Sequence, residues 1–449
     1  MNSALNAFLF STPAMTRVFS AHSQLRAMMR FEWALTAALE SRGLAEAGSS
    51  VVLEDLLQAG FVDGDALQQS ARDNGNVAIP FVRQLTAAVK ARSEAASRSI
   101  HLGATSQDVL DTALVLQIRE AVPLLHESLQ RLDSELVRQV REHAATVLSG
   151  RTWLQAGPPT TLGLKLAGTL TAVRRGDARL RLAAENLRVL QFGGAVGTLS
   201  ALGDAGAAVS AELARLLGLR EPEIPWHTQR DIVAEMVEVL ALLTASLAKF
   251  AADIALLMQS EVGEVAESGD ASRGGSSTMP HKHNPVACAA VLAAHARMPG
   301  LVTTMLAAMP QQHERGLGLW QAEWETVPEA FRLAAAALGY AEEIARELQV
   351  DAARMQSNLQ ASLGLPQSEA VSAALAHKMG RAAAHELLRD AAARAQRGRV
   401  NLAEVLKQMT AVTRHLDAAE IDRLLDPRNY LGSAQRFIEQ VLGDADAHR

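Results

Sequence analysis

The sequence predicts an all-α fold with a central bundle of five long helices. Apolar residues make up 49% of the 449 residues, yet only 4% of the residues are aromatic. Because alanine and leucine dominate instead, the composition favours long, closely packed helices over a β-rich core. Apolar positions also recur every three or four residues along several stretches, and strand signals are few. These observations together support the all-α prediction.

The order of the helices follows from that spacing and from the turn signals between them. In the first hundred residues, 20–40 is the clearest helix, and 73–76 is typical of a turn. Apolar residues then repeat at helical spacing from Asp111 to about Leu148, where Pro123 should introduce a kink. Further long helices are expected after Thr160, from Asp231 to Glu267, from near Asn284 and from Pro328 to Leu348, with shorter ones at 367–396, 401–410 and 418–426. Several long helices are apolar on more than one face, which indicates burial between subunits as well.

Charge and cysteine content narrow the possible partners and the location. The formal charge is −6, so no basic excess points to nucleic acid or to an anionic membrane surface. A single cysteine, Cys288, excludes an intrachain disulfide framework and suits a reducing compartment. The most apolar window, 236–258, contains Glu238, Lys249 and Asp253, which favours a buried helix over a membrane span. With no secretory signal at the N-terminus, we expect a cytoplasmic protein that binds neither nucleic acid nor membrane.

The least helical stretch, 274–285, carries the strongest chemical signal. Its glycines and serines expose backbone N–H groups that can hold an anion, and Lys282 and Asn284 add an ammonium and an amide. Such a set suits chemistry on a carboxylate substrate. Two simpler interpretations are a linker between helices and a metal site formed by His281 and His283, although no further ligands lie nearby.

Two other polar stretches have both a structural and a functional interpretation. In 99–108, Ser106 or Asp108 can cap a helix, or Thr105 and Ser106 can hold a substrate carboxylate with the helix N–H groups. The stretch 150–160 can be a proline-rich helix connector with a buried tryptophan, Trp153.

All three stretches resemble signatures of the fumarase/aspartase superfamily. Residues 275–285 match its loop G-S-S-x-M-P-x-K-x-N-P, and 101–108 match H-x-G-x-T-S-x-D. The stretch 150–160 is similar to the second signature, which usually carries a histidine where this chain has Trp153. The resemblance implies an all-α, three-domain protomer with an N-terminal helical domain (1–110), the long-helix bundle (111–355) and a C-terminal helical domain (356–449).

The resemblance also implies an assembly and a set of site residues. It implies a homotetramer in which three protomers share each active site, a small tricarboxylate substrate, and neither cofactor nor metal. By position in the loop, Ser276 matches the catalytic serine that transfers a proton, and Lys282 would stabilise the negative charge of an aci-carboxylate intermediate. The substrate-binding residues implied are His101, Thr105, Ser106, Arg151, Trp153, Gln155, Ser277, Met279, Asn284 and Arg315.

Departures from the superfamily pattern indicate which branch the chain resembles. Trp153 removes a histidine that transfers protons in several lyases, Gly75-Asn76 stands where the purine lyases have His-Asp, and Trp324 stands where they have a nucleotide-binding arginine. With Trp320 and 225–231, these residues resemble the cycloisomerases, which lactonise a carboxylated muconate during aromatic degradation through protocatechuate and β-ketoadipate. A β-elimination lyase, a sulfomuconate cycloisomerase and a non-catalytic helical oligomer remain as alternatives.

Overall fold

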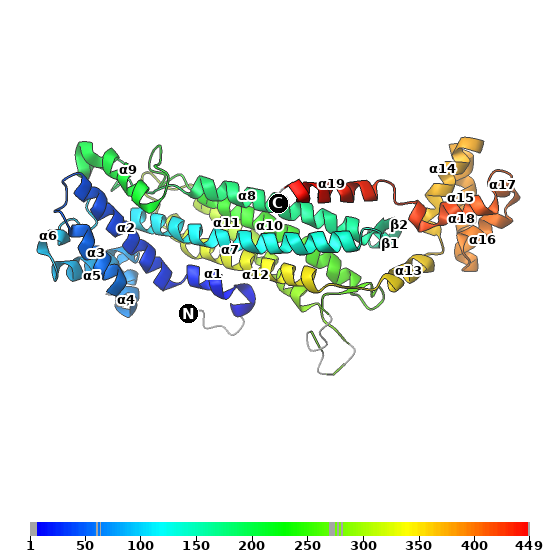
Figure 1. The fold of residues 1–449 in the computed structure, drawn as a ribbon, viewed down its shortest axis with the longest axis horizontal. Coiled ribbons are helices and arrows are strands. Elements are labelled where there is room, and N and C mark those ends of the chain that lie inside the picture. The colour runs from blue at the N-terminus through cyan, green and yellow to red at the C-terminus, as the bar shows by residue number, and fades with distance from the viewer. Residues whose placement is uncertain are drawn as a thin grey trace. The chain divides into compact units, whose positions relative to one another are not determined.

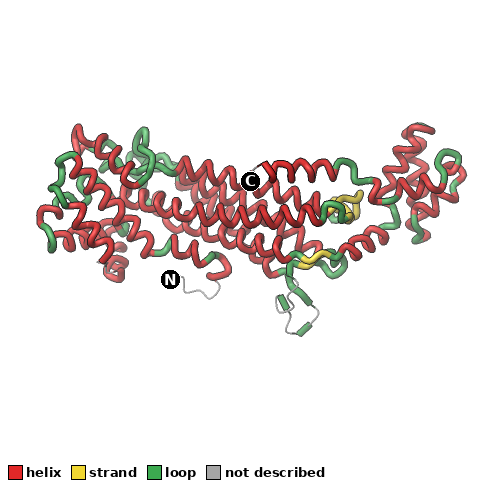
Figure 2. Tube along the Cα trace, in the orientation of Figure 1, coloured by secondary structure: helices red, strands yellow, loops and turns green. Residues whose placement is uncertain are grey.

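The prediction of an all-α fold is confirmed. The computed structural model describes residues 7–59, 62, 64–268, 274–275, 278–279 and 282–447. Helices dominate this part of the chain, where strands form only two small two-stranded sheets (Figure 1, Figure 2).

Five long helices are present, as predicted, but several of their boundaries differ from the prediction. The helices are α7 (Ser106–Glu142), α8 (Leu162–Leu187), α10 (Asp231–Leu257), α11 (Val286–Ala308) and α12 (Leu319–Glu347). Helix α7 begins at Ser106, before the predicted Asp111, and ends before the predicted Leu148. Helix α10 ends before the predicted Glu267. Helix α12 begins at Leu319 and contains Pro328, so this proline does not mark its start.

The chain forms two compact units, and each long helix contributes residues to both. One unit comprises 1–128, 176–244 and 293–337, and the other comprises 129–175, 245–292 and 338–449. The predicted division into three domains at 110 and 355 stays a prediction.

The first unit contains the N-terminal helices and the start of α7. Its shorter helices are η1 (Ala7–Phe10), α1 (Pro13–Val18), α2 (Ala21–Ser41), α3 (Ser49–Ala59), α4 (Gly64–Asn74), α5 (Ala78–Lys90), α6 (Glu94–Ser97), η2 (Ser200–Ala205) and α9 (Gly206–Leu217). The predicted helix 20–40 is α2, and the Ser20 hydroxyl caps it by accepting a hydrogen bond from Ser23 N. The predicted turn at 73–76 joins α4 to α5, with Gly75 at φ +71°.

The second unit contains a β-hairpin that the sequence analysis did not predict. Strands β1 (Val147–Thr152) and β2 (Gln155–Thr161) pair antiparallel, so the segment that connects α7 to α8 is a hairpin. Trp153 (φ +54°) and Leu154 (φ +64°) form its two-residue turn, where asparagine and glycine are the usual residues. Strands β3 (Val265–Ala266) and β4 (Gln349–Val350) form the second sheet.

The rest of the second unit is helical and has a core of its own. It contains α13 (Ala352–Ala361), η3 (Leu365–Gln367), α14 (Ser368–Met379), α15 (Arg381–Gly398), α16 (Leu402–Gln408), α17 (Thr410–Thr413), α18 (Ala418–Leu425), η4 (Pro427–Asn429) and α19 (Ala434–Ala447). The helix expected over 367–396 divides into α14 and α15 at Gly380, which has φ +89°. Leu375, Leu388 and Leu406 are among the buried residues that hold α14, α15 and α16 together.

Two of the long helices are long and apolar enough to cross a membrane, judged by length and composition alone. These are α10 and α11, in which 50% and 28% of the most apolar window is buried within the chain. Core helices of globular proteins have the same properties, so this observation does not establish a membrane span.

Candidate active site

The N-terminus of α7 presents two hydroxyl groups beside free helix N–H groups. Ser106 is the first residue of α7, and Thr105 precedes it. The structure assigns the capping role to Asp108, whose Oδ2 accepts a hydrogen bond from Thr105 N at 3.0 Å. Both hydroxyls are half-buried, and no hydrogen bond within the described part of the chain occupies them. They are therefore available to an anion at the positive end of the helix dipole.

Asp108 also fixes the segment 191–194 against this helix end. Its carboxylate accepts hydrogen bonds from Gln191 Nε2 at 3.0 Å, Gly193 N at 3.1 Å and Gly194 N at 2.9 Å. Burial raises the pKa of Asp108 to about 6, although the hydrogen bond from Gln191 and the charge of Arg315 favour the ionised form. A carboxylate that accepts four N–H hydrogen bonds has a structural role. The hydroxyls of Thr105 and Ser106 are therefore the groups that can contact a substrate.

Arg315 also holds the segment around Gly194, through hydrogen bonds to backbone carbonyl groups. Its guanidinium donates to Gln107 Oε1 at 2.6 Å, to Ala195 O at 3.2 Å and to Gly194 O. Burial lowers the pKa of Arg315 against the charge of Asp108. Since three protein acceptors already take up this guanidinium, the structure shows a positioning contact, and the substrate contact expected for Arg315 stays a prediction.

His101 lies in the turn before α7 and is held by a buried carboxylate from α2. Glu32 is fully buried and accepts hydrogen bonds from His101 N at 3.0 Å and from the Nδ1 side of its ring at 2.6 Å. Burial alone would lower the pKa of His101, but the Glu32 carboxylate raises it above its ordinary value. The pair therefore places a readily protonated imidazole four residues before Thr105.

A second buried charge cluster joins α7, α12 and Arg230, the residue that precedes α10. The Arg230 guanidinium is fully buried and donates to Asp111 Oδ2 at 2.7 Å and to Glu323 Oε1 at 3.0 Å. Trp320 Nε1 donates to Asp111 Oδ1 at 3.0 Å, and the Trp324 ring packs edge-on against Trp320 with 4.9 Å between centroids. The two carboxylates raise the pKa of Arg230 despite its burial. These contacts fix the first turns of α7 against α12.

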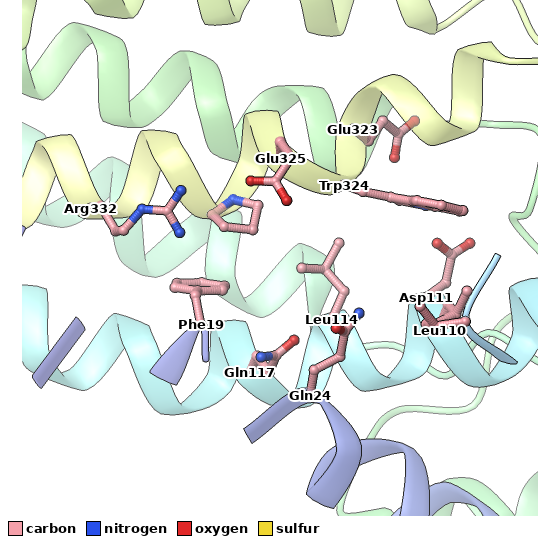
Figure 3. A pocket seen from close by; sticks show the side chains of 12 residues that line it. Phe19, Gln24, Leu110, Asp111, Leu114, Gln117, Glu323, Trp324, Glu325 and Arg332 are labelled. Carbon is pink, nitrogen blue, oxygen red and sulfur yellow. The ribbon is translucent and has the colours of Figure 1, made fainter. Parts of the chain in front are cut away.

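A cavity of about 230 Å³ adjoins this cluster (Figure 3). Its lining includes Asp111, Glu323 and Glu325, with Arg332 and the apolar side chains of Phe19 and Leu114 on other sides. Arg230 already pairs with Asp111 and Glu323, so the lining offers a tricarboxylate only the Arg332 guanidinium, which lies in the same lining as the Glu325 carboxylate. The anionic substrate is better suited to the N-terminus of α7.

In the second unit, the hairpin presents the residues of the second signature. Trp153 is 97% exposed and Leu154 is 75% exposed, so the expected burial of Trp153 is wrong for the single chain. Arg151 donates to both oxygens of buried Glu264, at 2.6 and 3.0 Å, and Asn358 Nδ2 donates to the same carboxylate at 2.8 Å. Gln155 is exposed at the start of β2. Arg151 is thus engaged, whereas Trp153 and Gln155 face solvent.

The base of the signature loop is closed by Asn284. Both its backbone N and its Nδ2 donate to Gly274 O, at 2.8 and 2.9 Å, and Gly275 bridges His283. The side chains of Lys282 and Met279 are exposed. Ser276, Ser277 and His281 lie outside the described residues. One amide hydrogen of Asn284 therefore holds the loop together, in addition to any contact with substrate.

Glu267 fixes the helix that follows this loop. Its two carboxylate oxygens accept hydrogen bonds from Ala287 N and Cys288 N, at 2.9 and 3.0 Å, at the N-terminus of α11. Burial and this carboxylate raise the pKa of the Cys288 thiol, so the single cysteine is unreactive. Within the described ranges, no group of three histidine, cysteine or acidic side chains could hold a metal ion.

The structure thus brings some predicted site residues together and leaves the grouping of others untested. His101, Thr105, Ser106 and Arg315 surround the first turn of α7 in the first unit. The second unit carries Arg151, Trp153 and Gln155 on the hairpin and Met279, Lys282 and Asn284 in the loop. Sequence reasoning missed Glu32 and Glu264, because each is distant in sequence from its partner and lies in no motif.

An all-α chain with two hydroxyl groups at the N-terminus of a long helix and a lysine-bearing Gly/Ser loop has the features expected of an enzyme of the fumarase/aspartase type. The chain belongs to the lyase family, whose model matches residues 8–300, and a model described as the adenylosuccinate lyase C-terminus matches 364–441.

The similarity to known proteins extends over nearly the whole chain. A 3-carboxy-cis,cis-muconate cycloisomerase from Pseudomonas aeruginosa is 49% identical over 446 residues, covering 99% of this chain and 97% of the relative. The crystal structure of a 3-carboxy-cis,cis-muconate lactonizing enzyme from Pseudomonas putida superposes with a TM-score of 0.93 at 45% identity, covering 99% of both chains. A nitrosuccinate lyase from Streptomyces davaonensis is 39% identical, covering 94% of this chain and 90% of the relative.

Proposed function

We propose that the protein converts 3-carboxy-cis,cis-muconate to 4-carboxymuconolactone. The observation that carries this proposal is the similarity to muconate cycloisomerases, which extends over 99% of the chain at up to 49% identity. The site agrees with it, because Trp153 stands where several lyases have a proton-transferring histidine, and Trp324 stands where the purine lyases bind a nucleotide.

The reaction is an intramolecular addition. One carboxylate adds to a conjugated double bond, and the carbon α to another carboxylate becomes negatively charged before it takes a proton. The tethered nucleophile supplies part of the rate enhancement through proximity. The Lys282 ammonium would stabilise the enolate-like charge, together with backbone N–H groups of the loop and the remaining amide hydrogen of Asn284.

The carboxylates of the substrate need fixed positions. The hydroxyls of Thr105 and Ser106 would hold one carboxylate at the N-terminus of α7, where the helix dipole favours negative charge. Gln155 would orient a second carboxylate, and Trp153 would exclude water from the reacting carbons. Arg151 and Arg315 would contribute mainly by positioning, since both guanidinium groups are held by protein acceptors.

Ser276 is proposed to hand the proton to the α carbon, with Ser277 and Met279 shaping the loop around the substrate. A serine hydroxyl needs neighbouring positive charge and N–H donors for this task, and the sequence of the loop supplies both. The test is the loss of diene absorbance when the purified protein meets 3-carboxy-cis,cis-muconate, with Ser276→Ala beside it. Rapid loss in the native protein and slow loss in the variant is expected. Equal rates in both would contradict the role of Ser276.

We further propose a cytoplasmic homotetramer in which three protomers share each active site. Large apolar side chains exposed on the single chain support this assembly: Trp153 and Leu154 at the hairpin turn, Leu242 and Leu256 on α10, and Leu292 and Leu306 on α11. Burying such side chains between subunits would be favourable. Light scattering of the purified protein tests the mass, and a monomer at working concentration would contradict the proposal.

A β-elimination lyase is the second candidate, because a nitrosuccinate lyase is 39% identical over nearly the same length. Such an enzyme would release fumarate or a similar unsaturated acid, which absorbs in the ultraviolet. Turnover of nitrosuccinate or of a succinyl-type substrate, without turnover of the muconate, would move the protein to the lyases. A sulfomuconate in the same assay would distinguish recognition of sulfonate from recognition of carboxylate.

A further inference from the structure

We propose that His101, held by Glu32, is the general acid that supplies the proton for lactonisation. This inference rests on the proposed function and adds to it a residue for a step that Trp153 cannot perform. Indole has no titratable group at neutral pH, so the second-signature position offers no proton donor here.

The geometry leaves one edge of the His101 ring for a substrate. Glu32 occupies the Nδ1 side at 2.6 Å and also accepts a hydrogen bond from the backbone N of His101 at 3.0 Å. The His101 side chain keeps 17% of its surface exposed, whereas Glu32 has none. Because the Nδ1 side faces the buried carboxylate, Nε2 is the ring nitrogen left for a substrate. No hydrogen bond in the described part of the chain takes up Nε2.

Burial of Glu32 explains why His101 would carry a proton. A fully buried carboxylate needs a cation or a proton of its own, and within the described ranges the only polar contacts of Glu32 are with His101. The Asp108 carboxylate, at the start of α7, favours the imidazolium too, and Arg315 faces Asp108 from the other side. These contacts keep the pKa of His101 above its ordinary value, so the protonated form persists to higher pH.

The other titratable groups near the α7 N-terminus suit this step less well. The Asp108 carboxylate accepts four N–H hydrogen bonds and is fully buried, so it cannot reach a substrate carbon. His227 is buried too, and burial together with the charge of Arg315 lowers its pKa, which disfavours the protonated form. His101 alone among these three combines a raised pKa with a partly exposed side chain.

The step balances without any co-reactant. A carboxylate oxygen bonds to the β carbon, and the π electron pair moves to the α carbon and its carboxylate. The α carbon takes a proton that originates on Nε2 of His101, and His101 is left neutral beside Glu32. A solvent proton restores the imidazolium. Each turnover consumes one proton, and nothing is oxidised or reduced.

The test is the pH dependence of kcat/KM for 3-carboxy-cis,cis-muconate in native protein, Glu32→Gln and His101→Gln. In the native protein, activity should fall as pH rises through the raised pKa of His101, since the acid form is lost there. Glu32→Gln keeps the shape and hydrogen-bonding oxygen of the side chain but removes its charge. The alkaline limb should then move to lower pH, while activity at the acidic end is retained. His101→Gln should lower kcat by about 100-fold or more at every pH.

A matched control is the similar dyad of His126 and Asp177. Its Nδ1–Oδ1 distance is also 2.6 Å, and its position has no part in the proposed site. Asp177→Asn should leave the alkaline limb of native activity unchanged. Glu32→Asp, which keeps the charge, should restore the limb towards its native position.

The outcomes separate this inference from the proposed function. The role of His101 would be overturned if native protein is active and the alkaline limb of kcat/KM in Glu32→Gln stays at its native pH. A near-native kcat in His101→Gln would also overturn it. A uniform loss at all pH values in Glu32→Gln would indicate a merely structural role and would overturn it as well. Should native protein and Asp177→Asn both fail to convert the muconate, the proposed function itself would be wrong. In that case, nuclear magnetic resonance titration of the His101 Cε1 proton, in native protein and in Glu32→Gln, still measures whether Glu32 raises the pKa of His101.

Discussion

At the N-terminus of α7, the charged groups near Thr105 and Ser106 have buried partners within the same chain, whereas at the hairpin turn Trp153 and Leu154 are exposed. Asp108, Glu32 and Arg315 hold the first region through hydrogen bonds to segments far apart in the sequence. Beside the hairpin turn, Arg151 is held by its ion pair with Glu264, whereas the two turn residues themselves are exposed. The first region is therefore preorganised by the chain alone, whereas the exposed turn of the second would be covered only in the proposed tetramer.

If the first region is preorganised by buried charge, breaking a buried ion pair there should cause the largest loss of stability. Arg230→Leu leaves Asp111 and Glu323 as unpaired buried carboxylates, and should lower the free energy of unfolding by about 3–5 kcal/mol. Denaturant unfolding followed by circular dichroism measures the change. The control Arg215→Leu removes an exposed partner of Glu212 and should leave unfolding unchanged.

The exposed loop should show the reverse behaviour, with loss of activity and no loss of stability. Lys282→Met should lower kcat/KM by about 100- to 1000-fold, because it removes the charge that stabilises the enolate-like intermediate. Lys90→Met, another exposed lysine, is the control and should be nearly neutral in both measurements. Near-native turnover by a folded Lys282→Met variant would refute the assignment of charge stabilisation.

The base of the signature loop, where Gly274 meets Asn284, resembles both regions. It is closely packed, like the N-terminus of α7, although the loop itself is exposed, like the hairpin turn. At Gly274, which has φ +66°, an added Cβ would lie 2.3 Å from Asn284 O, so alanine must displace the loop end. Gly274→Ala should lower kcat by about 10- to 100-fold, the loss expected when a catalytic group shifts by about 1 Å. Gly300→Ala, where nothing lies within 4 Å, is the matched control. Equal activity in both variants would mean that the loop base tolerates displacement.

The smallest effect on the folded chain is expected at the hairpin turn. Trp153→Ala removes a side chain that is 97% exposed, so the unfolding of the dissociated chain should not change. Assembly and turnover should both weaken, because the proposed partner surface loses its apolar anchor. Light scattering and turnover measured on the same sample test this. A clear loss of stability in the monomer would show that the turn packs within its own chain.

The sequence predicted the helices and the chemical residues better than it predicted how they are held. Helical spacing located the five long helices, because their buried faces repeat every three or four residues. It missed the end of α10 and the hairpin, since Trp153 and Leu154 adopt positive φ without glycine or asparagine to indicate it. It also missed Glu32, whose partner His101 lies 69 residues away. Tertiary contacts of this kind leave no local pattern.

In the proposed tetramer, separate chains would supply His101 and Lys282 to one active site. The most direct measurement is the activity of hybrid tetramers formed by coexpressing His101→Gln and Lys282→Met chains. Each variant alone should be nearly inactive. Hybrids should regain up to about a quarter of native activity, since random mixing gives that share of sites both native residues. No recovery in verified hybrids would mean that one chain supplies both residues, which would contradict the account.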